Sequence, residues 1–178
     1  MHKARHPPRP PISQPQRLVK YADEHVVYEL EMFFGAVRSR SLTIAATTRS
    51  TVGFFSNARV EAFANHLRNL ITFLYPGPYP VRKGDVAAHH YLPGPAPYAR
   101  WCRVRPQLSR TLKRAKKRAD KELAHLTDKR ISGVRAVKAW DFVGLGNEIR
   151  DVLQIFLGEA DPARLGTAVR GAIPNGAL

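Results

Sequence analysis

Apolar residues recur at steps of three and four positions in four separate segments of this chain, at about 16–38, 56–75, 106–126 and 141–156. That spacing gathers apolar side chains on one face of a helix, which must then be buried against another element. No convincing pair of strands and no internal repeat accompanies the pattern. The sequence therefore predicts an all-α fold, a four-helix bundle.

The helix ends carry partial signals. Ser56 or Asn57 can cap the second helix, and Pro106 suits the first turn of the third. Asp141 can cap the fourth, although glycines in its first turn leave a start nearer Asn147 as an alternative. The SLTIAATTRSTVG stretch at 41–53 has no clean period and is expected to be a connection, with a short strand as the other option.

Proline and glycine divide the rest of the chain. Residues 1–16 are rich in proline and basic residues and predict a disordered arm, residues 17–158 a single helical domain, and residues 159–178 a flexible tail. The segment 76–97 predicts a long, stiff connection with a helical turn near 86–91, either functional or draped over the core.

Composition removes several classes of protein. No apolar run approaches the roughly 18 residues that a membrane-spanning helix needs, and no secretory signal is apparent. A single cysteine, Cys102, allows neither an internal disulfide nor a multi-cysteine zinc site, which fits a cytoplasmic protein. The adjacent His89 and His90 point apart and make a weak metal site. No phosphate-binding loop or nucleophile elbow is present, so neither a metal nor a cofactor is expected.

Positive charge is concentrated in one part of the chain. The formal net charge is +15, and residues 100–130 hold twelve basic and three acidic residues. Such a block attracts polyanions, so RNA or DNA is the expected partner, ahead of an anionic membrane surface. Alternatively, the basic residues simply form a solvated helix face with no specific partner. The residues expected to hold the nucleic-acid backbone are Arg110, Lys113, Arg114, Lys117 and Lys121.

The same segment holds the one pair of residues suited to catalysis. Arg118 and His125 are seven positions apart, almost two helical turns, with Glu122 between them on the same line of the helix surface. Histidine can exchange protons with a ribose hydroxyl or a leaving oxygen, and a guanidinium can hold charge developing on phosphate. Alternatively, Arg118 pairs with Glu122 and His125 caps the end of the helix.

An arginine followed at this distance by a histidine, on a late helix of a small bundle, resembles the HEPN superfamily. The segment from Arg118 to His125 matches its motif at the longest permitted gap, with Ala119 where a polar residue is common. The resemblance implies a homodimer whose two motifs meet at a cleft, and a metal-independent endoribonuclease of a toxin, antiphage or RNA-processing system, with an antitoxin or other protein partner. The segments VEAFANHLRNLITFLYP, AHLT and WDF also resemble a group of uncharacterised bacterial helical proteins.

Two further groups could support such a site. Glu61 and Arg68 belong to a polar stripe on the second helix, with His66 beside it. Glu61 or His66 could orient Arg118 or His125; alternatively, Glu61, Asn65 and Arg68 form an ordinary surface ladder. Aromatic residues before the basic helix could stack bases or plug the end of the bundle; they are Tyr91, Tyr98 and Trp101. The sequence thus predicts a HEPN-like RNA-acting protein, or else a non-catalytic nucleic-acid-binding or protein-interaction module.

Overall fold

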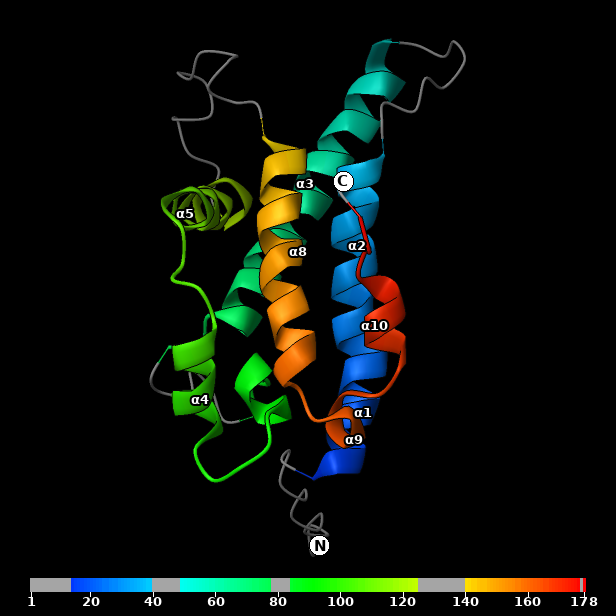
Figure 1. Ribbon diagram of the computed structural model, residues 1–178. Coiled ribbons are helices and arrows are strands. Elements are labelled where there is room, and N and C mark those ends of the chain that lie inside the picture. The colour runs from blue at the N-terminus through cyan, green and yellow to red at the C-terminus, as the bar shows by residue number, and fades with distance from the viewer. Residues whose placement is uncertain (1–13, 40–48, 78–83, 125–139, 177) are drawn as a thin grey trace, which may run out of the picture.

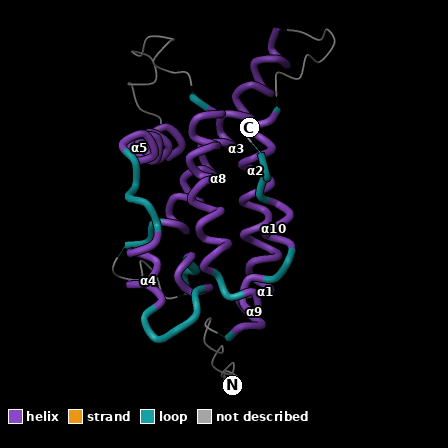
Figure 2. The backbone as a smooth tube through the Cα atoms, in the orientation of Figure 1, coloured by secondary structure: helices purple, strands orange, loops and turns teal. Residues whose placement is uncertain are grey.

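The computed structural model describes residues 14–39, 49–77, 84–124, 140–176 and 178, with the backbone alone at 49–57 and 122–124. These residues form helices joined by loops and contain no strand, which confirms the all-α prediction (Figure 2). Of the arm predicted for residues 1–16, residues 1–13 lie outside the described residues.

The first predicted helix is one continuous rod made of three parts: α1 (Pro15–Tyr21), the π-helical segment η1 (Ala22–Val26) and α2 (Val27–Arg38). In η1 the N–H of Val27 donates to the carbonyl of Ala22, five residues back, so the helix is locally wider than an α-helix. The apolar stripe of this rod is buried; it includes Leu18, Ala22, Val26, Leu30, Phe33 and Val37.

Two more long helices complete the centre of the fold, α3 (Arg49–Leu74) and α8 (Phe142–Glu159). Figure 1 shows α8 beside α2, with α3 passing behind them. Asp141 caps α8 as predicted, because its carboxylate accepts from the N–H of Gly144 at 2.9 Å. α3 begins at Arg49, before the predicted caps Ser56 and Asn57, since extending an existing helix needs no new nucleus.

The basic helix α5 (Arg110–Ala124) lies across the others and is seen end-on in Figure 1. It begins four residues after Pro106, because Ser109 is its cap: the Ser109 Oγ accepts from the N–H of Leu112 at 3.0 Å. The same hydroxyl donates to Glu148 on α8. On its inner face, α5 buries Leu112, Ala115 and Ala119, and the helix packs on α3.

The connection between α3 and α5 contains two short helices. The helical turn predicted near 86–91 is present as η2 (Ala88–Tyr91), whereas α4 (Pro97–Val104) was not predicted. Trp101 of α4 is fully buried, and its Nε1 donates to the carbonyl of Leu74 at 2.6 Å. Trp101 was predicted either to stack bases or to plug the end of the bundle, and the structure shows it as a core residue.

The C-terminal residues differ from the flexible tail expected for 159–178. They form α9 (Pro162–Leu165) and α10 (Ala168–Ala172), which bury Leu165 and Val169 against α1 and α2. The Asp161 N–H donates to the carbonyl of Tyr91 at 2.8 Å, and the Arg164 guanidinium donates to the carbonyls of His90 and Leu92 at 3.3 and 3.0 Å. These long-range contacts hold a segment whose own sequence is only weakly helical.

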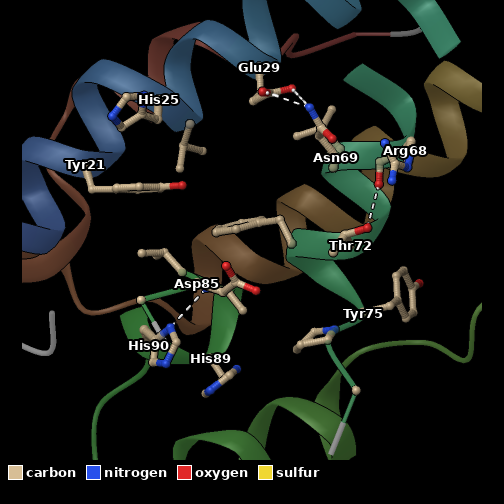
Figure 3. A pocket seen from close by; sticks show the side chains of 18 of the residues that line it. Tyr21, His25, Glu29, Arg68, Asn69, Thr72, Tyr75, Asp85, His89 and His90 are labelled. Carbon is tan, nitrogen blue, oxygen red and sulfur yellow. Dashed lines mark hydrogen bonds between the residues drawn. The ribbon is translucent and has the colours of Figure 1, made fainter. Parts of the chain in front are cut away.

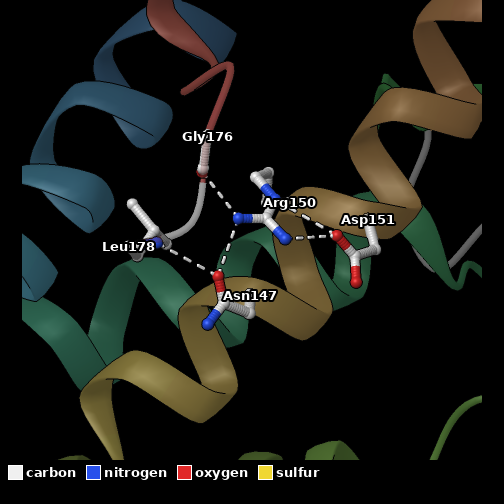
Figure 4. Close-up of polar contacts among 5 residues, drawn as sticks. All are labelled: Asn147, Arg150, Asp151, Gly176 and Leu178. Carbon is white, nitrogen blue, oxygen red and sulfur yellow. Dashed lines mark hydrogen bonds and ion pairs between the residues drawn. The ribbon is translucent and has the colours of Figure 1, made fainter.

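The last residues are fixed along α8 by polar contacts. Figure 4 shows Arg150 donating to the carbonyl of Gly176 at 2.6 Å, and Asn147 accepting from the N–H of Leu178 at 3.3 Å. Gly146 of α8 leaves room for the side chains of Leu178 and Val37, because a Cβ at this position would lie 2.8 Å from Leu178 and 3.1 Å from Val37.

None of the helices in the described ranges is both long and apolar enough to cross a membrane. Within those ranges, no three His, Cys, Asp or Glu side chains gather closely enough to hold a metal ion.

Candidate nucleic-acid interface

The five residues predicted to hold nucleic acid are all exposed on α5; they are Arg110, Lys113, Arg114, Lys117 and Lys121. At the helical rotation per residue they fall within roughly 100° of the circumference, opposite the buried Leu112 and Ala119. Because the opposite, buried face of α5 packs on α3 and α8, this face is directed away from them; α5 itself lies at the edge of the molecule in Figure 1. We call these five residues the basic stripe.

Arg118 lies on one flank of the basic stripe and is partly buried. Its guanidinium carbon is 4.1 Å from the centroid of the Trp140 ring, a cation–π contact that fixes this side chain against the residue preceding Asp141. His125 lies outside the described residues, and only the backbone of Glu122 is described. The geometry of the predicted catalytic pair therefore stays a prediction.

The other flank is tied to α3. Arg68 lies 2.6 Å from the carboxylate of Asp120, and Lys116 lies 3.2 Å from the same carboxylate. Asp120 and Arg118 are two residues apart on α5, so their side chains leave the helix on nearly opposite sides. Arg68 was given as a possible supporting residue or as part of a surface ladder; its described ion pair joins α3 to α5 on the flank opposite Arg118.

The other two candidates on α3 have different surroundings. Glu61 is exposed on the helix surface. His66 is buried, with its Nδ1 2.7 Å from Glu29 Oε2 on α2 and its ring edge-on to Tyr28. Asn69 donates to both oxygens of Glu29, at 3.1 and 3.2 Å. The described partners of His66 thus join α3 to α2.

A cavity of about 940 Å³ opens beside the Arg68 flank. Figure 3 shows its walls: the first rod with Tyr21, His25 and Glu29, the last turns of α3, the loop with Asp85, and η2 with His89 and His90. Lys116 of α5 also lines it. The sequence predicted no such site. Its only signals were the long connection at 76–97 and the four-residue spacing of Tyr21, His25 and Glu29.

Two histidines in this wall are uncharged near neutral pH. Burial lowers the pKa of His89 to about 4, assisted by the nearby His90 and Arg105, and burial also lowers the pKa of His90. His90 Nδ1 accepts from the N–H of Ala87 at 3.0 Å. The Nδ1 of His89 is buried and has no hydrogen-bond partner among the described residues.

Comparison with protein-family models, with curated proteins and with solved structures found no match to this chain.

Proposed function

We propose that this protein binds RNA along the basic stripe of α5. The observation that carries the proposal is the exposure of five cations on one face of a single helix, opposite its buried side. Cations spaced one helical turn apart can each neutralise a phosphate of a strand lying along the helix and release its counterions. A solvated surface helix of ordinary type alternates both signs of charge, whereas the stripe carries one sign.

The stricter form of the proposal is a HEPN-like, metal-independent endoribonuclease in which Arg118 and His125 act on the scissile phosphate. Its support is the short Arg-to-His motif together with the position of Arg118 beside the stripe, where Trp140 holds its guanidinium. The resemblance further implies a homodimer, which sedimentation equilibrium of the full chain would test. A toxin-like role with an antitoxin partner belongs to the same proposal.

Binding is tested by salt dependence. A triple variant, K113Q/K117Q/K121Q, should bind short single-stranded RNA about tenfold more weakly at moderate salt, and its plot of log affinity against log salt should be shallower by about 2, since each phosphate contributes about 0.7. A matched triple variant with the same charge change, K20Q/R38Q/R103Q, removes exposed cations outside α5. Equal losses in the two variants, or no binding by the wild type, would contradict the proposal.

Cleavage is tested separately. Labelled RNA is incubated in EDTA with the wild type, with His125→Ala and with Arg118→Lys, which keeps the charge but not the planar geometry. Cleavage by the wild type alone supports the nuclease. If RNA is bound and never cut, or is cut equally by all three proteins, the catalytic assignment fails while the binding proposal stands. That outcome would leave a non-catalytic nucleic-acid-binding module.

A further inference from the structure

The cavity beside α5 has two sides of opposite charge. Two carboxylates line one side, Glu29 from the first rod and the exposed Asp85 from the loop before η2. Two cations line its edge, Arg68 and Lys116, which share the carboxylate of Asp120 and so leave the edge with one net positive charge. A ligand that fits both sides carries hydrogen-bond donors at one end and negative charge at the other.

Aromatic rings form much of the wall between these two sides. Tyr21 from the first rod, Phe73 and Tyr75 from α3, and Tyr98 from α4 all line the cavity. Figure 3 shows the Tyr21 ring projecting inward, with its hydroxyl directed to the space between Glu29 and Asp85. Burial, followed by the charges of Glu29 and Asp85, raises the pKa of Tyr21, so its hydroxyl stays protonated at neutral pH. Such rings offer flat faces on which a planar ligand can stack.

Glu29 is held in place before any ligand arrives. Its carboxylate receives contacts from His66 at 2.7 Å and from Asn69 at 3.1 and 3.2 Å, and His66 is itself 5% exposed. These contacts leave acceptor capacity on the carboxylate toward the cavity. Asp85 follows Gly84, whose φ of +107° makes the turn that a residue with a side chain rarely adopts. The fold therefore positions the Glu29 carboxylate, and the turn at Gly84 places Asp85 in the cavity wall.

The backbone of this wall is also unusual. Tyr21 directly precedes the π-helical segment η1, and His25 lies within it, with the two rings 4.7 Å apart. π-helical turns are rare and occur often at functional sites. The irregularity therefore falls in the stretch of the first rod that lines the cavity.

The edge of the cavity continues into the basic stripe. Lys116 is three residues after Lys113, so the two side chains are neighbours on the α5 surface and Lys116 borders the stripe. A strand whose phosphates lie on the stripe would pass this edge, and a single nucleotide turned inward would place its base between the aromatic rings and its phosphate near Lys116 and Arg68.

We propose that the cavity binds one unstacked base of a single-stranded RNA held on α5, and that it prefers bases bearing an amino group over uracil. The inference rests on the proposed function. Carboxylates accept from exocyclic amines, as in the pairing of acidic side chains with the cytosine amine, whereas the uracil carbonyl at the same position would face them as a second acceptor. The base stacks on Tyr21, and its phosphate remains on the side of Lys116 and Arg68, away from the two carboxylates.

The test compares oligocytidine with oligouridine of equal length, two pyrimidine strands that differ at the amino position. Fluorescence anisotropy at fixed salt should show that the wild type binds oligocytidine at least about fivefold more tightly. Asp85→Asn should move this ratio toward one, as should Tyr21→Leu, which keeps apolar volume but removes the flat ring. Glu31→Gln makes the same charge change as Asp85→Asn at an exposed acid of α2 outside the cavity, and should leave the ratio unchanged.

The outcomes separate the two proposals. If both strands bind equally well and K113Q/K117Q/K121Q weakens both, RNA binding stands and the base pocket is wrong. A ratio that persists in both cavity variants also overturns the pocket. If no strand binds, the α5 proposal fails, and calorimetry with cytidine and uridine 5′-monophosphates tests the pocket alone. Binding of neither nucleotide, or of both equally, overturns it.

Discussion

The guanidinium of Arg68, on α3, lies 2.6 Å from the carboxylate of Asp120, on α5, and Lys116 approaches the same carboxylate from the next turn. The Arg68 and Asp120 side chains are 47% and 41% exposed, so the pair contributes at most about 1 kcal/mol to stability. The pair has a larger effect on the surface charge, because Asp120 partly neutralises two cations, Arg68 and Lys116, beside the basic stripe.

Asp120→Asn should therefore change the melting temperature little and strengthen RNA binding, by about threefold at low salt, because two cations become available to phosphate. Titration by fluorescence anisotropy measures the gain. Asp151→Asn is the matched control, since Asp151 also pairs with an arginine, Arg150 at 2.7 Å, but lies on α8. Equal gains in both variants would mean that only net charge matters and not the position of Asp120.

His89 should make the fold sensitive to acid. Its pKa falls from 6.5 to about 4 on folding because the charged ring is disfavoured by burial and by His90 and Arg105. The unfolded chain therefore binds the proton first, and the stability contributed by the neutral ring is fully present above pH 6.5 and is lost as the pH falls toward 4. Thermal unfolding followed by circular dichroism should show this decline, and His89→Gln should reduce it. Parallel pH profiles for the two proteins would contradict the assignment.

The C-terminal packing can be tested at Leu165, which is fully buried. Leu165→Ala should lower the free energy of unfolding by about 2–3 kcal/mol, because it removes buried methyl groups and leaves a cavity. Val143→Ala is the control, since Val143 is 47% exposed, and should cost less than about 0.5 kcal/mol. A loss at Leu165 no larger than at Val143 would mean that the segment is as loosely attached as its sequence suggested.

The sequence predicted those features that depend on a repeating pattern along one helix. The spacing of Leu112, Ala115 and Ala119 identified the buried face of α5, and the exposed face with Lys113 and Lys117 followed from it. The cap at Asp141 was also predictable, because a carboxylate that accepts from the first helical turn is a local feature.

Features that depend on contacts between distant segments were not predictable in this way. α4 is eight residues long and buries one tryptophan, Trp101, whose partners Leu74 and Phe156 lie far away in the sequence. α9 and α10 are shorter still and exist through tertiary packing. The cavity combines side chains from the first rod, α3, α4, α5 and the loop before η2, and no local pattern brings these segments together.

The hydrogen bonds from Asp161 and Arg164 to the backbone of residues 90–92 also affect how the molecule opens locally. Proteins open in cooperative units set by which segments hold one another, and such units need not follow chain order. η2, which carries the histidines of the cavity wall, is held here by a segment about seventy residues later in the sequence. We therefore expect amide hydrogen exchange to show η2 and α9 opening as a single unit, and detachment of the C-terminal segment to release one wall of the cavity as well.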